Sequence, residues 1–386
     1  MNFTYGSICY INTAHIMNNL SALPQKSIGR LYPEQSDHRS PYERDRDRIY
    51  HSTAFRKLKD KTQVFMFEKG DYYRNRLTHT LEVSQIARSI SRQLNLNEDL
   101  AECIALCHDL GHSPFGHVGE EIIAQELDLQ FDHNYQSFRQ VTVLEKKYFN
   151  FDGLNLSWET LDGLIKHNGI IHNSEHNYNL SSNFIFNLNK NPSLEAQIAT
   201  LSDDIAYIAH DFDDGIRAGI IHIDALAQLQ DTALNFLDFN FLKNMEPKLS
   251  RNYISRSIVN YLVLDVIHET KKNVHNNNIQ NFNEIIHYPI FLASFSNSVK
   301  EKVLDLKKYL FDNFYTSRFV QEGRIKAESI LLFIISYLND DIERLPKSWQ
   351  IKIDSEESKK QTIIDYICGM TDQFAIKFYN SYAPKN

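Results

Sequence analysis

Apolar residues recur at helical spacing over much of the chain, and this periodicity is the feature that most limits its fold. Leu194, Ile198, Leu201, Ile205 and Ile208 lie three or four residues apart, which predicts a long amphipathic helix over 193–212. Few segments alternate apolar and polar residues as a half-buried strand would, and only 13 glycines and 9 prolines interrupt the chain. The sequence therefore predicts an all-α fold, with further helices over 77–94, from Asn97 to the region of Gly111, and over 299–312, 324–338 and 360–380.

The overall composition is that of a globular protein with enough apolar material for a large core. The chain has 386 residues, of which 42% are hydrophobic, and 41 Lys and Arg against 49 Asp and Glu give a net charge of −8. At roughly 150 residues per domain, this length predicts two to three domains, or one large domain with an appended lobe. The acidic balance argues against generic nucleic-acid binding, which uses many cations against phosphate, but it allows a local site for a polyanion.

Neither the apolar runs nor the cysteines indicate a membrane or secreted protein. The longest apolar run, near 330–336, is too short to span a bilayer, and the N-terminus lacks a basic segment followed by an apolar one. Four cysteines in so long a chain do not make a disulfide framework, and we expect Cys103 and Cys107 to be small buried hydrophobes. These features predict a cytoplasmic protein.

Residues 40–48 carry three arginines interleaved with two aspartates, and two interpretations of them stay open. Arg44, Arg46 and Arg48 can form a solvated helix face on which Asp45 and Asp47 compensate their charge. The alternative is that one or two of these arginines point into a phosphate site.

The stretch that most directly indicates chemistry is rich in histidine. His108, His112 and His117 lie within ten residues, among glycine and proline that a plain helix hairpin would not require. The side chains of His108 and Asp109 would diverge by about 100° in the middle of a helix. At the frayed end of a helix, next to Gly111, both can converge on one ion. A mixed set of imidazole and carboxylate ligands suits Mn, Fe, Zn, Co or Ni better than Ca.

Two residues outside this stretch are the obvious further ligands. They are His79, from the preceding helix, and Asp203, from the helix expected over 193–212. Taken singly, each has a plainer interpretation, since a lone histidine on an amphipathic helix is commonly a core or surface residue and Asp203 beside Asp204 can form a solvated face. The density of histidines from His108 to His133 favours the metal site.

The order His79, then His108 with Asp109, then Asp203 resembles the order of metal ligands in the HD superfamily of phosphohydrolases. Longer blocks resemble the bacterial deoxyguanosinetriphosphate triphosphohydrolase family. They read HSTAFRKL at 51–58, KTQVF at 61–65, RNRLTHTLEV at 74–83 and HDLGHSPFGH at 108–117. The segments 131–139, 153–159, 203–207 and 369–375 extend the similarity, which covers residues 30–382. These blocks in this order are far more specific than a lone His-Asp pair.

The resemblance implies a metal-dependent reaction. His79, His108, Asp109 and Asp203 would bind one divalent metal, namely Mn²⁺, Mg²⁺ or Fe²⁺. The family cleaves the bond between the 5′ oxygen of a deoxynucleoside and the α-phosphorus of its triphosphate, and releases the deoxynucleoside and tripolyphosphate. A divalent ion in such a site can lower the pKa of bound water from 15.7 towards ~7 and polarise a phosphoryl oxygen.

The resemblance also assigns a general acid. The leaving 5′ alkoxide is strongly basic and needs a proton, and His117 matches the family position for this role. Glu120 lies three residues further along, so we expect it to hold the other ring nitrogen of His117 and raise the pKa of that imidazole. His112 and His133 match positions that face the phosphates.

Three more residues are expected to bind substrate. Arg76 lies three residues before His79 on the same helical face and is a candidate for a charge-assisted phosphate contact. Tyr207 and Asp211 follow Asp203 by four and eight residues, on one stripe of a helix. They match positions that touch the sugar, where Asp211 can accept from a 3′-hydroxyl and Tyr207 occupies the space of a 2′-hydroxyl. The other interpretation is that Tyr207 fills the core and Asp211 is a surface charge.

Asp204 departs from the animal relatives of the family, which carry a phosphate-contacting lysine after the metal aspartate. A carboxylate at this position repels a triphosphate, so another cation must compensate. The candidates are Arg44, Arg46, Arg48, Arg56, Lys57 and Lys166. The chain has no Gly-rich phosphate loop of the GxxxxGK[ST] type, so an ATP-driven motor or a kinase is unsupported.

These inferences predict an N-terminal arm over 1–60, an HD-domain helical core over 61–235 and an appended C-terminal helical lobe over 236–386. The expected activity is that of a dNTP triphosphohydrolase in the cytoplasm. The resemblance further implies a homo-oligomer that responds to a nucleotide or single-stranded DNA effector.

Two other functions fit part of the pattern. A phosphohydrolase of the same fold that acts on another nucleotide, such as a deoxynucleoside monophosphate, fits the metal ligands but not His117 with Glu120. A non-catalytic HD protein that senses nucleotide or nucleic acid need not keep a general acid. Release of orthophosphate would favour the first, and tight metal-dependent binding without turnover would favour the second.

Overall fold

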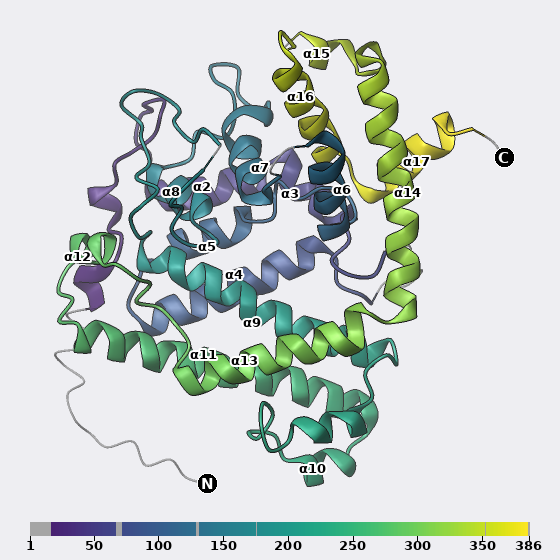
Figure 1. Ribbon diagram of the computed structural model, residues 1–386. Coiled ribbons are helices and arrows are strands. Elements are labelled where there is room, and N and C mark those ends of the chain that lie inside the picture. The colour runs from purple at the N-terminus through teal and green to yellow at the C-terminus, as the bar shows by residue number, and fades with distance from the viewer. Residues whose placement is uncertain (1–16, 67–71, 129–130, 175, 352, 385–386) are drawn as a thin grey trace.

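The computed structural model describes residues 17–66, 72–128, 131–174, 176–351 and 353–384, and its regular structure is helical (Figure 1). Within these ranges three isolated β-bridges occur but no strand ladder. The prediction of an all-α fold is confirmed.

The N-terminal half of the chain holds the helices that surround the histidine-rich stretch. These are α2 (Pro41–Tyr50), α3 (Thr53–Lys57), α4 (Arg76–Gln93), α5 (Glu98–Cys107), α6 (His117–Leu127), α7 (His133–Arg139), α8 (Trp158–Ile165) and α9 (Leu194–Arg217). The short 3₁₀ turn η1 (Pro24–Lys26) precedes them, and between them lie the 3₁₀ turn η2 (Leu58–Asp60) and the π-turn η3 (Gln140–Leu144).

The C-terminal half continues with helices of very different length. They are α10 (Phe239–Lys243), α11 (Pro247–Asn276), α12 (Phe282–His287), α13 (Asn297–Leu310), α14 (Arg318–Asp340), α15 (Lys347–Gln350), α16 (Glu356–Cys368) and α17 (Asp372–Tyr382). The 3₁₀ turns η4 (Ile223–Leu229) and η6 (Ile342–Arg344) and the π-turn η5 (Phe311–Tyr315) connect them. Among the described residues, none of the helices has both the length and the apolar character that a bilayer crossing requires.

Three of the helices expected from periodicity begin directly after a residue whose side chain caps them. The side chains of Asn75, Asn97 and Ser193 accept hydrogen bonds from the backbone N–H groups of the first turns of α4, α5 and α9. These caps satisfy N–H groups that have no partner inside the helix. Helix α9 runs five residues beyond the expected end at 212, and α14 begins at Arg318 instead of 324.

The helical stretch expected over 360–380 is helical but divided into two helices. Helix α16 ends at Cys368, and α17 begins at Asp372 with Thr371 as its N-cap. The Thr371 side chain accepts from the backbone N–H of Phe374, an alternative to continuing the helix that threonine offers readily. The break at 369–371 places Asp372 at the start of a new helix.

Two apolar cores organise the molecule. In what we call the first core, α4 packs against α5 and α9, and α9 packs against α11. In the second core, α6 packs against α14 and shares buried side chains with α16 and α17. Figure 1 shows α4 and α9 crossing in the middle of the molecule and α6 beside α14 at its edge. Helix α6 thus lies within 61–235 by sequence but packs with helices of 236–386, and the domain boundaries at 60 and 235 stay predictions.

The expectation for Cys103 and Cys107 is confirmed. Both side chains are fully buried, and burial raises the pKa of each thiol well above its ordinary value. A thiol that stays protonated and buried packs as a small hydrophobe. Cys9 lies outside the described residues.

The arginines of α2 fasten the N-terminal arm to the core, and neither of the two interpretations drawn from the sequence describes them. Arg44 pairs with Asp37 at 2.9 Å, and Arg46 pairs with Asp99 at 2.6 Å. Arg48 is buried, pairs with Glu34 at 2.6 Å and donates to the Leu154 carbonyl at 2.8 Å. Their short contacts are with partners outside α2, and within the helix Arg46 lies 3.9 Å from Asp47, so local charge compensation is only a minor part of what holds them.

Truncation of a single buried side chain in the second core should destabilise the protein. Ile334 of α14 is 0% exposed, whereas Ile325 on the same helix is 62% exposed. Ile334→Ala should lower the free energy of unfolding by about 2–5 kcal/mol, because it leaves a cavity. Ile325→Ala, the matched control, should change it by less than about 0.5 kcal/mol. Urea denaturation measures both, and equal losses would contradict this description of the core.

Candidate metal centre and active site

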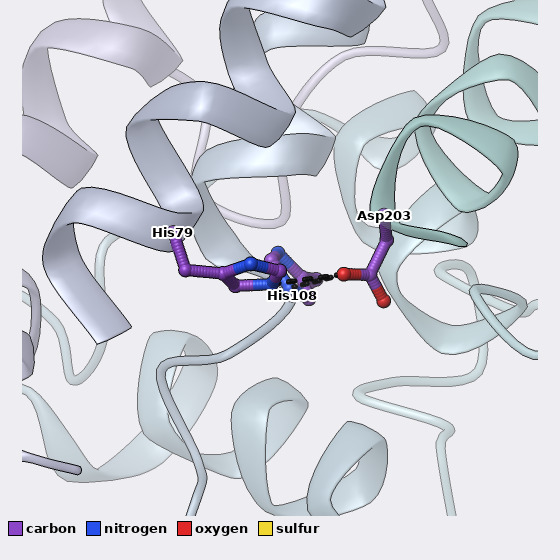
Figure 2. Close-up of side chains that lie close together, drawn as sticks. All are labelled: His79, His108 and Asp203. Carbon is purple, nitrogen blue, oxygen red and sulfur yellow. Dashed lines mark ion pairs between the residues drawn. The ribbon is translucent and has the colours of Figure 1, made fainter. Parts of the chain in front are cut away.

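Three side chains from three helices converge in the middle of the first core. They are His79 in α4, His108 at the C-cap of α5 and Asp203 in α9. Figure 2 shows the two rings and the carboxylate pointing toward one another. The Asp203 Oδ1 atom lies 2.9 Å from His79 Nε2 and 3.7 Å from His108 Nε2. The three ligand atoms lie within 4.8 Å of one another, close enough to hold one ion.

His108 is oriented as a metal ligand would be. Its Nδ1 lies 2.6 Å from the Ala105 carbonyl, which assigns the ring proton to Nδ1 and leaves a lone pair on Nε2. Nε2 is buried and has no hydrogen-bond partner. Burial lowers the pKa of His108 to about 4, so the ring is neutral at neutral pH. A buried lone pair beside a carboxylate fits a divalent cation.

Asp203 supplies the negative charge of this group. Burial alone would raise the pKa of its carboxyl, but His108, His167 and His79 hold that pKa well below the ordinary value. An ionised carboxylate beside the imidazoles of His79 and His108 is a suitable ligand set for a divalent transition metal.

Asp109 connects His79, His108 and Asp203, which we call the metal group, to a second group of histidines. Its Oδ1 lies 3.4 Å from His108 Nε2 and 3.2 Å from His112 Nε2, and its Oδ2 accepts from Arg76 at 2.9 Å. Asp109 is not in the compact group of three, and its role as a fourth ligand stays a prediction.

Arg76 is buried with two donor atoms unused. Only its Nη1 has a partner, Asp109, while Nε and Nη2 are buried without a hydrogen-bond acceptor. A Cβ atom at Gly116 would lie 2.8 Å from Nη2, and the φ of +61° at this glycine is one that side chains disfavour. The glycine therefore leaves space for the guanidinium, whose free donors are available to an anion.

The second group consists of His112, His133 and Glu120. The Glu120 Oε1 atom lies 2.9 Å from His112 Nδ1 and 3.0 Å from His133 Nδ1, and the two rings stack with centroids 4.3 Å apart. Burial alone would lower the pKa of His133, but the Glu120 carboxylate raises it above its ordinary value. These three donors also lie close enough together to hold a cation.

The expected pairing of Glu120 with His117 is wrong. The Glu120 carboxylate contacts His112 and His133. The pKa of His117 is lowered by partial desolvation and by the charges of His112 and Arg76, although its side chain is exposed. The physical reason is tertiary, since α7 brings His133 to Glu120 and offers the carboxylate a bridging position. His117 remains next to the group, with its ring 5.6 Å from that of His112.

His117 also lines a cavity of about 310 Å³. This cavity is lined by Tyr207 of α9 and by Tyr315 of η5 as well. The Tyr315 hydroxyl donates to Asp211 Oδ2, and the rings of Tyr207 and Tyr315 stack with centroids 6.1 Å apart. Burial raises the pKa of Asp211 to about 7. The structure thus gathers Tyr207 and Asp211 with a tyrosine from the C-terminal region.

Two histidines near the metal group were missed by sequence reasoning. His167 Nε2 lies 3.5 Å from Asp203 Oδ2, and His210 Nδ1 lies 3.3 Å from His79 Nδ1. The Nε2 atom of His210 in turn pairs with Glu82. His210 follows Asp203 by seven residues, two helical turns, and this spacing could have indicated it. His167 follows α8 and has no such local signal.

The cation that compensates Asp204 was missed too. Lys307 of α13 lies 2.6 Å from Asp204, and both side chains are partly exposed. The six cations expected for this role contact other groups. Lys166 is buried and pairs with Asp162 at 2.6 Å. Lys57 donates to the Gly369 carbonyl, and Arg56 donates to the His51 carbonyl. The three arginines of α2 bind as described above.

Comparison with known proteins shows what this chain resembles as a whole. Residues 76–208 match the HD domain, and residues 293–381 match the phosphohydrolase-associated domain. A deoxyguanosinetriphosphate triphosphohydrolase-like protein of Rickettsia prowazekii is 44% identical over 374 residues, which cover 94% of this chain and 97% of that protein. Its counterpart in Rickettsia typhi is 46% identical over 375 residues, with the same coverage. A crystal structure of a hypothetical protein from Aquifex aeolicus matches at 17% identity over 72% of this chain and 69% of that one. Its TM-score of 0.31 is too low to support an argument.

Metal binding should depend on Asp203 and not on the neighbouring Asp204. Asp203→Ala removes the only carboxylate of the compact group, so metal affinity should fall by more than the ~10–100-fold that loss of an outer partner causes. Asp204→Ala, the matched control, should keep its metal, because Asp204 pairs with Lys307. Metal analysis of the purified variants by mass spectrometry measures both. Full metal content in Asp203→Ala would contradict the ligand assignment.

Proposed function

Because this chain belongs to the family of deoxyguanosinetriphosphate triphosphohydrolase-like proteins, which makes it an HD-domain phosphohydrolase, we propose that it hydrolyses a deoxynucleoside triphosphate to the deoxynucleoside and tripolyphosphate. The proposal concerns which bond is cleaved and which side chains take part. It rests on the position of His117 next to both a group of histidines and a cavity.

The position of His117 is the observation that carries the proposal. Its ring lies 5.6 Å from that of His112, in the histidine group around Glu120, and it also lines the cavity to which Tyr207 contributes. A nucleotide with its phosphates among the histidines and its nucleoside in the cavity has its 5′ oxygen at this boundary. An acid at the boundary can protonate that oxygen, whereas removal of the terminal phosphate would need an acid deeper among the phosphate ligands.

The proton for the 5′ alkoxide is supplied by His117 in this proposal. In the free protein partial desolvation of the ring and the charges of His112 and Arg76 lower the pKa of His117, although its side chain is exposed at the surface. A bound triphosphate brings several negative charges, which favour the protonated imidazole and raise that pKa. The acid is therefore charged when substrate is present, and the strongly basic leaving group then takes its proton.

The phosphate chain is proposed to lie against four side chains that can donate hydrogen bonds to it. Arg76 offers two buried donors without a partner, and His133 has a raised pKa because Glu120 pairs with it. His112 shares the same carboxylate. Lys307 pairs with Asp204 in a partly exposed position, where ion pairs are weak, so it can turn to a phosphate.

The sugar is proposed to lie against Tyr207 and Asp211. Tyr207 lines the cavity, and its ring is held by the stacked ring of Tyr315. A tyrosine that cannot move aside excludes a 2′-hydroxyl. Asp211 already accepts from the Tyr315 hydroxyl and has a further oxygen with which to accept from a 3′-hydroxyl.

His79, His108 and Asp203, with Asp109 as a fourth, are the residues proposed to hold the divalent metal. HD domains bind divalent metals, and the mixed imidazole and carboxylate set favours Mn²⁺ or Fe²⁺, with Mg²⁺ as the third candidate. When bound, the ion supplies Lewis-acid activation of the phosphoryl group and of water.

Three further properties are proposed on the family resemblance. They are action in the cytoplasm, assembly into a homo-oligomer, and regulation by a nucleotide or single-stranded DNA effector.

Product analysis tests the proposed reaction. Purified protein is incubated with each dNTP, singly and mixed, with Mn²⁺ or Mg²⁺, and the products are separated by anion-exchange chromatography. We expect deoxynucleoside and tripolyphosphate in equal amounts. Deoxynucleoside monophosphate with pyrophosphate, or orthophosphate from a monophosphate substrate, would contradict the proposed bond cleavage. Tight binding without turnover would favour the sensing protein.

His117→Ala tests the proton donor. Turnover should fall by ~10²-fold or more, as is typical for loss of a general acid, while metal content stays unchanged. The matched control is His38→Ala, since His38 is an exposed histidine of the N-terminal arm and should leave turnover as it is. Unchanged turnover in His117→Ala would remove His117 from this role.

A further inference from the structure

His117 and the metal group belong to different apolar cores, whereas His133 begins α7, whose Phe138 lies in the first core. His79 and Asp203 lie on α4 and α9 of the first core, whereas His117 begins α6, whose side chains pack in the second core with α14 and α16. Apolar packing alone therefore does not fix the distance between the acid and the metal group. Polar contacts across the boundary must do so.

The loop that joins the two halves has an unfavourable backbone. Phe115 has a φ of +61°, a value uncommon for residues other than glycine, and Gly116 follows with the same φ. The loop runs from His112 to His117 and so carries two of the proposed active-site residues. Such a conformation persists only where the surroundings hold it.

Asp372, at the start of α17, holds this loop. Its carboxylate is 7% exposed, and its Oδ1 accepts from the backbone N–H of Phe115 at 3.0 Å. Its Oδ2 accepts from the backbone N–H of Thr62 at 2.9 Å. The Lys61 carbonyl next to Thr62 accepts from the N–H of Arg76, the first residue of α4. One buried carboxylate therefore ties the histidine loop to the helix that carries His79.

Other residues between 365 and 372, which we call the anchor segment, contact the neighbouring parts of the site. Lys61 is buried and donates to the His112 carbonyl at 2.5 Å and to the Cys368 carbonyl at 2.8 Å. Asp365 accepts from Gln136 of α7 at 2.9 Å and from Arg139 of the same helix. Helix α7 begins at His133, so the anchor segment reaches each element that carries an active-site histidine outside the metal group.

We propose that the anchor segment positions the histidine half of the active site relative to the metal group, with Asp372 as the principal positioning residue. The break between α16 and α17 is then functional, because it turns the Asp372 carboxylate toward the loop. The catalytic part of this proposal rests on the proposed function above, but the structural part does not.

Asp372→Asn tests the proposal with the smallest change of shape. An amide has one oxygen, so either Phe115 or Thr62 loses its acceptor. Hydrogen–deuterium exchange, read by mass spectrometry on the metal-loaded protein, should become faster in the peptide covering 112–118 and stay unchanged in peptides of α4 and α9. In turnover assays kcat should fall by ~10-fold or more with little change in KM, because a displacement of about 1 Å can cost ~10²-fold. Metal content should not change.

Asp341→Asn is the matched control. Asp341 is also an aspartate that caps a turn in the C-terminal region, but its partners are local, since it accepts from the Glu343 N–H and pairs with Arg344 at 3.5 Å. Its variant should exchange and turn over as the wild type does.

Asp365→Asn provides a second, independent variant, which keeps the test decisive if Asp372→Asn does not fold. Its faster exchange should lie in the peptide covering 131–139, which contains His133. Unchanged exchange at the expected peptides would overturn the proposal, and so would equal acceleration throughout α4 and α9, which indicates a merely stabilising role. Wild-type protein without triphosphohydrolase activity would count against the proposed function, while the exchange pattern would still decide on the anchor segment.

Discussion

The carboxylate of Asp203 is the point at which separate parts of the first core meet. One of its oxygens faces His79 and His108, and the other lies 3.5 Å from His167. Buried imidazoles beside a half-buried carboxylate are costly unless each is paired, so this convergence favours one packing arrangement of the helices. The packing of α4, α5 and α9 around that point gives the site its fixed geometry, and a divalent ion is what the arrangement accommodates best.

The rest of the site lies at the boundary between the two cores. The segment that matches the HD domain, 76–208, contains the metal group and His117, but Tyr315, Lys307 and Asp372 come from the C-terminal region. The C-terminal region therefore contributes walls and supports to the site and is more than an appended lobe. The proposed acid, His117, begins a helix of the second core and the proposed metal ligands lie in the first, so the proposed reaction depends on how accurately the two cores are joined.

The sequence predicted the features that depend on local spacing, but not those that depend on tertiary contacts. Periodicity predicted α9 and the all-α class, but not the interruption of 360–380, where a threonine cap competes with the helix. Spacing placed Glu120 near His117, yet could not show that α7 brings His133 to the same carboxylate. Tyr315 and Lys307 lie more than 100 residues after the α9 residues that they contact, and no local pattern indicates such partners.

Turnover in water enriched in ¹⁸O tests the central claim most directly, because it reports which bond is broken. The account predicts one ¹⁸O atom in each tripolyphosphate and none in the deoxynucleoside, since water attacks the α-phosphorus and the 5′ oxygen leaves with a proton from His117. Label in the 5′-hydroxyl of the deoxynucleoside, or in orthophosphate or pyrophosphate, would contradict it.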